Sequence, residues 1–466
     1  MDRDSERVPG GWGAAARLAC ILLLPVACAG PPRKDGGGGA SLQRLPEIED
    51  VRRIPQRMAG LAEAAGERLA VDPHCRAAQL EEFRRNFHLP WSSKTHLEDP
   101  EKSRGFMRQQ ARGKWFLVNK RRITPPLMRE LLDNCALDQF PTRNDPAIAV
   151  APGHLRALPT SMPFYERADA APFDMLSYPQ VKLNEPLRVL HASRDGVWLF
   201  VETVYSNGWL EARDVALVDP DQVSTLVGGA HLAITRDYAP IPNGRGNAVY
   251  RAKIGTILPL AGRGDGWWEV SVASAGEGGK AELRKVRVPV DVAARFPLEF
   301  TKENIALIGD QMLGQPYGWG EQHDLRDCSA LLRDFFLPFG IWLPRTSSDQ
   351  IGSLPGRLQL AKRGANEKQE LIGREGVPFQ SLLFKPGHIM LYVGRDEEGR
   401  PLVFHDAWSI RVKEDEGEKG TTRMIGFSVI TTLEPGKELG LVPGTSLLEK
   451  VTEMGTLTHR CGKRPE

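Results

Sequence analysis

The sequence lacks the residue patterns of nucleic-acid-binding proteins and of zinc proteins. Its 61 basic and 59 acidic residues are spread over 466 positions, with a net charge of +2 and no basic block of the kind that follows a phosphate backbone. It contains no C-x-x-C or H-E-x-x-H spacing. We therefore expect no nucleic-acid partner, no metal and no cofactor.

The first 29 residues have the pattern of a secretory signal. Arg3, Arg7 and Arg17 make a positively charged start, and the apolar run Leu18–Ala27 that follows is shorter than the roughly 20 residues that span a bilayer. Leu24–Cys28 resembles a lipoprotein box in which Cys28 is lipidated, and ordinary cleavage at an A-x-A site fits the same segment. Both alternatives stay open. Each predicts export to the cell envelope or periplasm, and the first adds membrane attachment by a lipid.

The spacing of apolar residues along the sequence changes twice after this signal, which indicates several domains. Apolar residues first recur at helical spacing, then short strands alternate with turns, and finally a helix–strand order typical of an α+β domain begins near Thr301. The predicted segments are a signal at 1–29, a flexible linker at 30–44, a helical domain at 45–170, a first small β-barrel at 171–228, a second at 229–298, and an α+β domain at 299–466.

A short repeat supports the two barrels. Asp195–Trp198 and Asp265–Trp268 both place an Asp-Gly turn before a strand that carries tryptophan. This indicates an internal duplication of a unit of about 60 residues. We expect most of the aromatic residues here to fill the barrel cores.

Four cysteines follow the signal: Cys75, Cys135, Cys328 and Cys461. In an exported protein two of them can form a disulfide. Cys75 and Cys135 lie in the same N-terminal region and are the favoured pair. The alternative, that both are buried thiols, stays open, because sequence alone does not choose among pairings.

Cys328 has the context of a nucleophile. Asp327 is a good N-cap residue, so it places Cys328 in the first turn of a helix, where backbone N–H groups and the helix dipole favour a thiolate. We therefore predict a lowered pKa for this thiol. The glycine-rich loop before it gives access from solvent, although buried inert cysteines are also common.

Two histidines can serve this cysteine as a base and its orienting partner. His388 begins an apolar strand, a polar turn follows at 395–400, and the return strand ends at His405. If the turn is centred between Glu397 and Glu398, His388 lies opposite Ala407. His405 is then the diagonal neighbour of His388 on the same sheet face. We expect the helix of Cys328 to pack across that face. A lone histidine is more often a core or surface residue, and His323, near Cys328 in sequence, lies in the loop.

Three motifs together carry a family resemblance. Asp327-Cys328-Ser329, Leu343–Ser347 with Gln350, and Pro386-Gly387-His388 resemble the NlpC family of papain-like cell-wall cysteine peptidases. The layout upstream resembles the branch that has a helical N-terminal domain and two bacterial SH3-like barrels. The resemblance implies a multi-domain fold: a helical domain, two SH3-like β-barrels and a C-terminal α+β papain-like peptidase.

The resemblance also implies an activity and roles for single residues. The activity is hydrolysis of the bond between γ-D-glutamate and a diamino acid in peptidoglycan (murein) peptides, with a preference for a free N-terminal L-Ala. Cys328 is the nucleophile, with its backbone N–H as oxyanion donor, His388 is the base and His405 orients it. The implied substrate-binding residues are Asp327, which helps to bind the free amine, Ser329, Ser347 and Trp319. Tyr205 of the first barrel is expected to close one end of the cleft, unless it is an ordinary surface tyrosine.

The sequence departs from the family pattern at three places. Ala330 replaces the glycine that usually follows Asp-Cys-Ser, and the linker 350–380 is long and charged. The Gly-Asp-Leu strand that usually precedes the catalytic histidine is not recognisable, because Phe384–Gly387 runs directly into His388. Two other functions stay open: a wall-binding scaffold with an inert peptidase domain, and acyl transfer to an amine by the same site. We expect a monomer.

Overall fold

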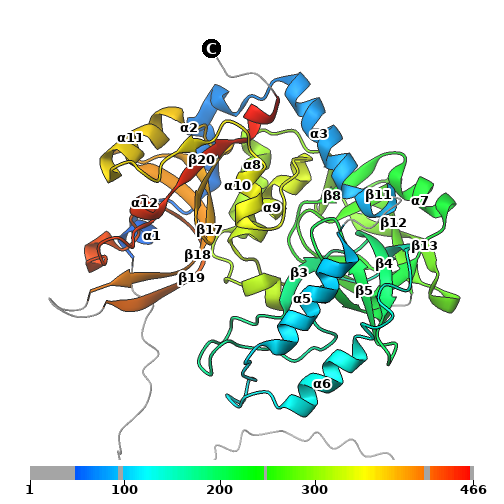
Figure 1. Ribbon diagram of the computed structural model, residues 1–466. Coiled ribbons are helices and arrows are strands. Elements are labelled where there is room, and N and C mark those ends of the chain that lie inside the picture. Colours follow the sequence, from blue (N-terminus) through cyan, green and yellow to red (C-terminus); the bar gives the residue numbers. More distant parts are fainter. Residues whose placement is uncertain (1–47, 93–97, 246–248, 414–419, 462–466) are drawn as a thin grey trace, which may run out of the picture. The chain divides into compact units, whose positions relative to one another are not determined.

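The computed structural model describes residues 48–92, 98–245, 249–413 and 420–461, which contain three β-sheets, a two-stranded ribbon and the helices that pack on them (Figure 1). The predicted signal at 1–29, with Cys28, and the linker at 30–44 lie outside the described residues. Among the helices that are described, none is long and apolar enough to cross a bilayer.

Within the described residues, six α-helices precede the first strand, and the sequence accounts for where three of them start. Asp72, Asp99 and Thr124 each cap a helix that has proline in its first turn. The helices are α1 (Glu49–Arg53), α2 (Met58–Ala65), α3 (Pro73–Phe87), α4 (Leu89–Ser92), α5 (Pro100–Arg112) and α6 (Pro125–Asn134).

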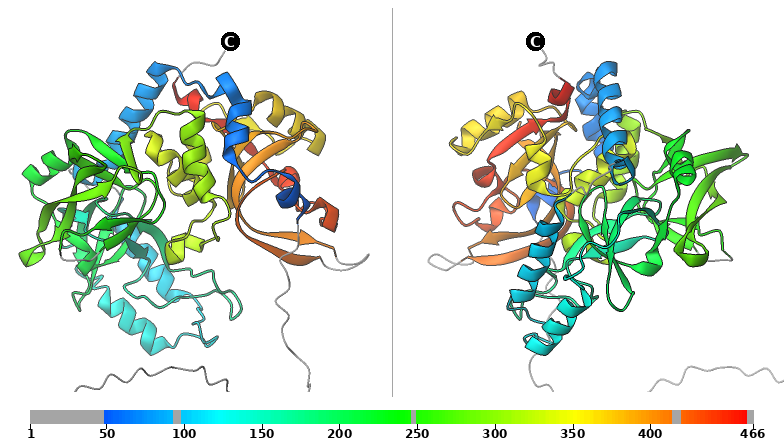
Figure 2. Two further views of the ribbon diagram at one scale, coloured as in Figure 1. Left: turned by 180° about the vertical axis from the view of Figure 1, so that it is seen from behind. Right: turned by 45° about the vertical axis from the view of Figure 1, so that its right-hand side comes forward.

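These helices pack into two different hydrophobic cores. Met58 of α2 and Phe83 of α3 are buried in one cluster with the C-terminal domain, whereas Met107 of α5 and Met128 of α6 are buried in a cluster with the first barrel. Figure 2 shows α2 (blue) beside the orange strands, and α5 and α6 (cyan) below the green ones. Short amphipathic helices bury one face only and need a partner surface.

The first sheet contains seven strands in the order β3-β2-β6-β5-β4-β1-β7. Two of them lie within the range predicted to be helical, because a run as short as 147–149 shows neither period clearly. Trp198 and Trp209 fill its core, as expected for the barrel aromatics. The strands are β1 (Asp145–Ala149), β2 (Gly153–Arg156), β3 (Ser177–Val181), β4 (Pro186–Ala192), β5 (Trp198–Glu202), β6 (Asn207–Glu211) and β7 (Val215–Leu217).

The second barrel repeats the turn of the first, after the connecting helix α7 (Pro220–Val227). Gly196 and Gly266 both adopt a positive φ, of 71° and 74°, in the two Asp-Gly turns. A five-stranded sheet in the order β13-β12-β11-β8-β14 stands beside the ribbon β10-β9. The strands are β8 (His231–Ile234), β9 (Ala239–Pro242), β10 (Val249–Ala252), β11 (Ile257–Gly264), β12 (Trp267–Ala275), β13 (Ala281–Pro289) and β14 (Ala293–Phe296).

The C-terminal domain sets helices against a six-stranded sheet in the order β15-β20-β16-β17-β18-β19. Its helices are α8 (Lys302–Met312), α9 (Cys328–Phe336), α10 (Ser347–Gly352), α11 (Ala365–Glu375) and α12 (Leu447–Lys450). Its strands are β15 (Leu358–Gln359), β16 (Ser381–Lys385), β17 (His388–Arg395), β18 (Pro401–Val412), β19 (Thr421–Thr431) and β20 (Glu453–Thr456).

One disulfide joins the two ends of the described chain. Cys75 on α3 bonds Cys461 near the C-terminus, and these segments lie side by side in Figure 1. Cys135 is a free, buried thiol. The favoured pairing of Cys75 with Cys135 is therefore wrong, because Cys135 points into the core of the first barrel.

Candidate active site

Cys328 is the first residue of α9, as the sequence predicts. The Asp327 carboxylate caps this helix and accepts a hydrogen bond from the Ala330 N–H at 2.9 Å. The helix ends at Phe336 and passes through a short 3-10 turn to Gly340, which is left-handed. Cys328 therefore sits where the first N–H groups of the helix have no partner within it.

The pKa of the Cys328 thiol is raised to about 12, which corrects the predicted lowering. Burial is the main cause, since the residue is 8% exposed, and the charge of Asp327 adds to it. The Ile389 N–H and Arg345 act in the opposite direction but are outweighed. The resting nucleophile is thus a thiol that must lose its proton as it attacks.

His388 and His405 form the hydrogen bond that the predicted register made available. His388 Nε2 lies 2.9 Å from His405 Nδ1, although a bulge in the hairpin interrupts the pairing near Gly394. His405 Nε2 in turn lies 2.9 Å from the Thr431 hydroxyl. That hydroxyl lies 2.7 Å from the carbonyl oxygen of Thr432.

The hydrogen bond from Thr431 to Thr432 fixes the direction of the other two hydrogen bonds in this series. A carbonyl can only accept, so the Thr431 hydroxyl donates to Thr432 and accepts from His405 Nε2–H. His405 Nδ1 is then an acceptor, and His388 must donate to it from Nε2–H. His388 is left with an unprotonated Nδ1, the atom that a general base needs.

The helix α9 does not pack across the histidine face, contrary to the prediction. Leu391 and Phe404 share a hydrophobic cluster with Cys328, so they mark the sheet face that α9 covers. Side chains alternate along a strand, and this places His388 and His405 on the other face. Cys328 and both histidines meet instead near the start of β17, where they line one cavity of about 240 Å³.

Thr431 is a positioning residue that sequence reasoning missed, because nothing marks it before the sheet forms. We expect Thr431→Val to lower kcat about 10-fold or more with little change in KM, since His405 loses the acceptor that fixes its tautomer. The acid limb of the pH profile should also move to lower pH, because a weaker hydrogen bond from His388 destabilises its protonated form. Thr431→Ser keeps the hydroxyl and should restore both properties. Equal profiles for Val and Ser would contradict the assigned tautomers.

The buried histidines predict activity that persists into mild acid. Burial, followed by the charges of His405 and Lys385, holds the pKa of His388 well below 6.5, and burial lowers that of His405 to about 3. The base stays neutral until the pH falls through its lowered pKa, so the acid limb of kcat/KM should lie below pH 6.5. As the pH drops below about 6.5, these histidines bind protons in the unfolded chain but not yet in the folded protein. The free energy of unfolding therefore falls with decreasing pH in this range. Rates from pH 4 to 8, with melting curves alongside, test this; an acid limb at or above 6.5 contradicts it.

Asp327 and Ser329, the predicted substrate-binding pair, are held by an arginine that sequence reasoning did not single out. Arg345 donates to both oxygens of Asp327, at 3.1 and 2.6 Å, and to the Ser329 hydroxyl at 2.7 Å. Ser329 also donates to Asp327 at 3.0 Å. Three of these partners converge on Oδ1 of Asp327, whereas its Oδ2 accepts from Arg345 alone and keeps capacity for a further donor.

A series of packed aromatic rings connects the first barrel to the cavity. The indole of Trp319 donates to the carbonyl of Asp174 at 3.2 Å, and its ring meets the edge of Phe173. Phe173 packs against Trp408, and Trp408 packs against Tyr317. Trp408 and Tyr317 line the cavity, whereas Trp319 reaches it only through Phe173.

The structure does not place Tyr205 or Ser347 in the cavity. Tyr205 stacks on Trp342 with ring centroids 4.8 Å apart, and the Arg333 guanidinium lies over its ring. It joins the first barrel to the C-terminal domain through α9. Ser347 begins α10 after the cap Thr346. The first barrel instead contacts the cavity lining through Phe173, a loop residue that packs against Trp408 and for which the sequence carries no signal.

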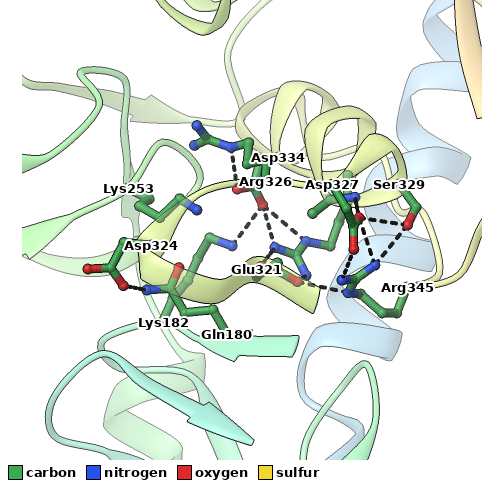
Figure 3. A network of polar contacts seen from close by, with 12 residues as sticks. Gln180, Lys182, Lys253, Glu321, Asp324, Arg326, Asp327, Ser329, Asp334 and Arg345 are labelled. Carbon is green, nitrogen blue, oxygen red and sulfur yellow. Dashed lines mark hydrogen bonds and ion pairs between the residues drawn. The ribbon is translucent and has the colours of Figure 1, made fainter. Parts of the chain in front are cut away.

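A buried network of charges holds both barrels to α9 (Figure 3). Asp334 accepts hydrogen bonds from Lys182 of the first barrel at 2.7 Å, from Arg326 at 2.8 Å and from Arg333. Arg326 also pairs with Asp237 of the second barrel at 2.6 Å. Arg326 lies just before Cys328 in the sequence, and Asp334 lies within α9. The network therefore fixes the start of α9 against both barrels.

The loop before the nucleophile is tied to the same network. Glu321 is buried, adopts a positive φ of 65°, and accepts from Arg333 at 2.9 and 2.7 Å. It also pairs with Arg345 at 2.8 Å. These partners lower the pKa of Glu321 to about 2, despite its burial. A left-handed glutamate is strained, and its two arginine partners hold it in place.

Four segments of the chain match known families in the order that the resemblance implied. Residues 17–140 match the N-terminal stabilising domain of NlpC/P60 proteins, 163–211 an SH3 domain of the SH3b1 type, 219–264 an SH3 domain of the SH3b2 type, and 314–422 the NlpC/P60 family. No curated protein gives a match to the chain.

A solved structure shows the same fold. A structure described as a novel NlpC/P60 endopeptidase from Photobacterium damselae subsp. piscicida aligns with a TM-score of 0.77 and 21% identity, over 87% of this chain and 97% of that one. An NlpC/P60 family protein from Bacillus cereus aligns over 67% of this chain and 99% of its own, with 14% identity and a TM-score of 0.47. The first likeness supports the order of the domains over the 87% of the chain that aligns.

Proposed function

The chain is a multi-domain member of the NlpC/P60 family of cysteine peptidases, and on that basis we propose that it hydrolyses the bond between γ-D-glutamate and a diamino acid in murein peptides. The observation that carries this proposal is the meeting of Cys328, His388 and His405 in one cavity. The hydrogen-bonded chain to Thr431 leaves the basic nitrogen of His388 free.

In the proposed reaction the Cys328 sulfur attacks the γ-carbonyl of D-glutamate while His388 Nδ1 takes the thiol proton. The oxyanion that forms is stabilised by the N–H of Cys328 at the helix start. His388 then gives the proton to the leaving amine of the diamino acid, and a thioester remains on Cys328. Water, deprotonated by His388, hydrolyses the thioester and regenerates the thiol.

Two features of the cavity support this substrate. A γ-linked D-glutamate carries a free α-carboxylate beside the scissile bond, and Lys385 lines the cavity with a positive charge to receive it. Through Phe173 and Trp408, the first SH3 domain adjoins the cavity. Such a wall favours short peptides with a free N-terminal L-Ala over long cross-linked strands.

The test compares two tripeptides, L-Ala-γ-D-Glu-L-Lys and its α-linked isomer, with the purified enzyme. We expect the release of lysine from the γ-linked peptide alone. Cleavage of both at similar rates overturns the proposed bond specificity. No cleavage with retention on isolated peptidoglycan supports a binding scaffold, and a product joined to an added amine supports acyl transfer.

We also propose that the protein is exported and acts in the cell envelope. The N-terminal pattern is one support. The disulfide between Cys75 and Cys461 is a second, because such bonds persist in oxidising compartments. The mass of the mature N-terminus, measured on protein from the producing cell, decides between a lipidated Cys28 and plain cleavage. An uncleaved N-terminus contradicts export by either route.

A further inference from the structure

A tight turn between α5 and α6 exposes an apolar side chain beside positive charges. Val118 is 72% exposed, more than any other large apolar side chain of the described residues. It lies inside a turn that is closed by a hydrogen bond from the Lys120 N–H to the Leu117 carbonyl oxygen at 2.8 Å. Arg121 and Arg122 follow directly. A single exposed valine is common on protein surfaces, but its charged surroundings are not.

The segment that contains this turn carries charge of one sign only. Residues 102–129 include nine lysines and arginines and no aspartate or glutamate, and Glu101 and Glu130 flank them. At most three of the basic residues are consecutive, so the sequence shows no continuous basic block. Because the fold brings several of them together, they produce a positive potential that attracts an anionic partner. Five of them are exposed and have no ion pair among the described residues: Lys114, Lys120, Arg121, Arg122 and Arg129.

The base of the turn is held by the first barrel. Phe116 and Tyr165 exchange two backbone hydrogen bonds of 2.8 Å, and Phe116 also pairs with Arg122 across the turn. The guanidinium of Arg122 lies 5.4 Å from the centre of the Phe116 ring. The exposed tip and its cations therefore project from an ordered base.

A cavity of about 410 Å³ adjoins the turn, between the end of α5 and the start of α6. Trp115, Ile123 and Leu132 line it, and these side chains pack only in part against the core that α5 and α6 share with the first barrel. An apolar lining beside cations fits an amphiphile that has an anionic head group and a hydrocarbon part. Three exposed cations line the same cavity: Lys114, Arg122 and Arg129.

We propose that this part of the protein docks on a membrane that contains anionic phospholipids. Charge complementarity selects this occupant, because the phosphates of such a membrane neutralise the exposed cations and its apolar interior receives Val118 and faces the cavity. A free phosphate ion supplies only the charge. The inference is independent of the peptidase activity and of any lipid on Cys28. The docking surface, called the hairpin surface below, consists of Val118, Lys114, Lys120, Arg121, Arg122 and Arg129.

The test is co-sedimentation of the full chain with lipid vesicles. Every protein carries Cys28→Ala, so that no lipid can be attached at that position, and the apolar run at the N-terminus is the same in all of them. We expect vesicles of phosphatidylglycerol and phosphatidylethanolamine to bind the protein at least about 10-fold more tightly than vesicles of phosphatidylcholine. Raising the salt concentration from about 0.1 M to about 1 M should remove most of this difference, because salt screens exposed charges.

Substitutions in the hairpin surface separate the charges from the apolar tip. Lys114→Glu with Arg121→Glu should weaken binding to the anionic vesicles about 10- to 100-fold. Val118→Asp should weaken it about 10-fold, and Val118→Leu should bind as the parent does. The matched control is Arg251→Glu with Lys280→Glu, which makes the same change of charge at exposed residues of the second barrel and should bind as the parent does.

All of these side chains are exposed and lie outside the active-site cavity, so melting temperatures and peptidase activity should stay the same. Three results would each overturn the proposal. The first is a parent protein that does not bind the anionic vesicles or binds the neutral ones equally well. The second is an equal loss of binding in the hairpin double variant and in its control, or no loss in either. The third is retention on soluble polyphosphate without binding to vesicles, which would assign the hairpin surface to a polymer.

Discussion

Cys328→Ala should abolish hydrolysis of the γ-linked tripeptide, with a loss on the order of 10⁴-fold or more in kcat. No other described cysteine can replace it: Cys75 and Cys461 are bonded to each other, and Cys135 is buried in the core that the first barrel shares with α5 and α6. The peptide should still bind, because alanine removes only the sulfur. Product formation followed by chromatography, and peptide binding followed by calorimetry, measure the two effects separately.

The matched control for this substitution is Cys135→Ala. Cys135 is the second free thiol of the described chain, and burial raises its pKa to about 12 as well. The two thiols thus share burial and a raised pKa, and only Cys328 lies beside histidines in a cavity. We expect Cys135→Ala to keep its activity. Loss of activity in both variants, or in neither, would contradict the assignment of the nucleophile.

Asp334→Ala should destabilise the protein by about 3–5 kcal/mol, the effect typical of removing one partner from a buried ion network. Asp334 is 0% exposed and is the acceptor on which Lys182, Arg326 and Arg333 converge. Without it three cations lie together in the interior with one negative neighbour fewer. Denaturant unfolding measures the change in the free energy of unfolding.

Two comparisons make this prediction specific. Asp334→Asn keeps the shape but removes the charge, and we expect it to be destabilised as well. Asp291→Ala breaks an exposed pair with Arg236, which should change the free energy of unfolding by less than about 1 kcal/mol. Similar small effects at Asp334 and Asp291 would show that the buried network does not hold the barrels to α9.

Local features of the site were predictable from sequence because they depend on neighbours in the chain. An aspartate followed by an apolar helical run is enough to place Cys328 at the start of α9. A hairpin of known turn position is enough to bring His388 and His405 within reach of each other. The NlpC/P60 match and the two SH3 domains also agree with the motifs and the repeat.

Features that depend on distant segments were not predictable in this way. Phe173 and Thr431 reach the site from a barrel loop and from β19, and no spacing in the sequence relates them to Cys328. The same reason explains the disulfide, whose cysteines are 386 residues apart. The raised pKa of Cys328 depends on burial and on Asp327, and a helix start alone predicts the opposite sign.

The most direct test of the proposed enzyme is hydrolysis of L-Ala-γ-D-Glu-L-Lys in water enriched in oxygen-18. Water hydrolyses the thioester, so the product L-Ala-D-Glu should carry one heavy oxygen in its γ-carboxylate, with free lysine as the second product. Mass spectrometry with fragmentation locates the label. A product without the label, or no product from enzyme that is folded and carries Cys328, would contradict hydrolysis through a Cys328 thioester.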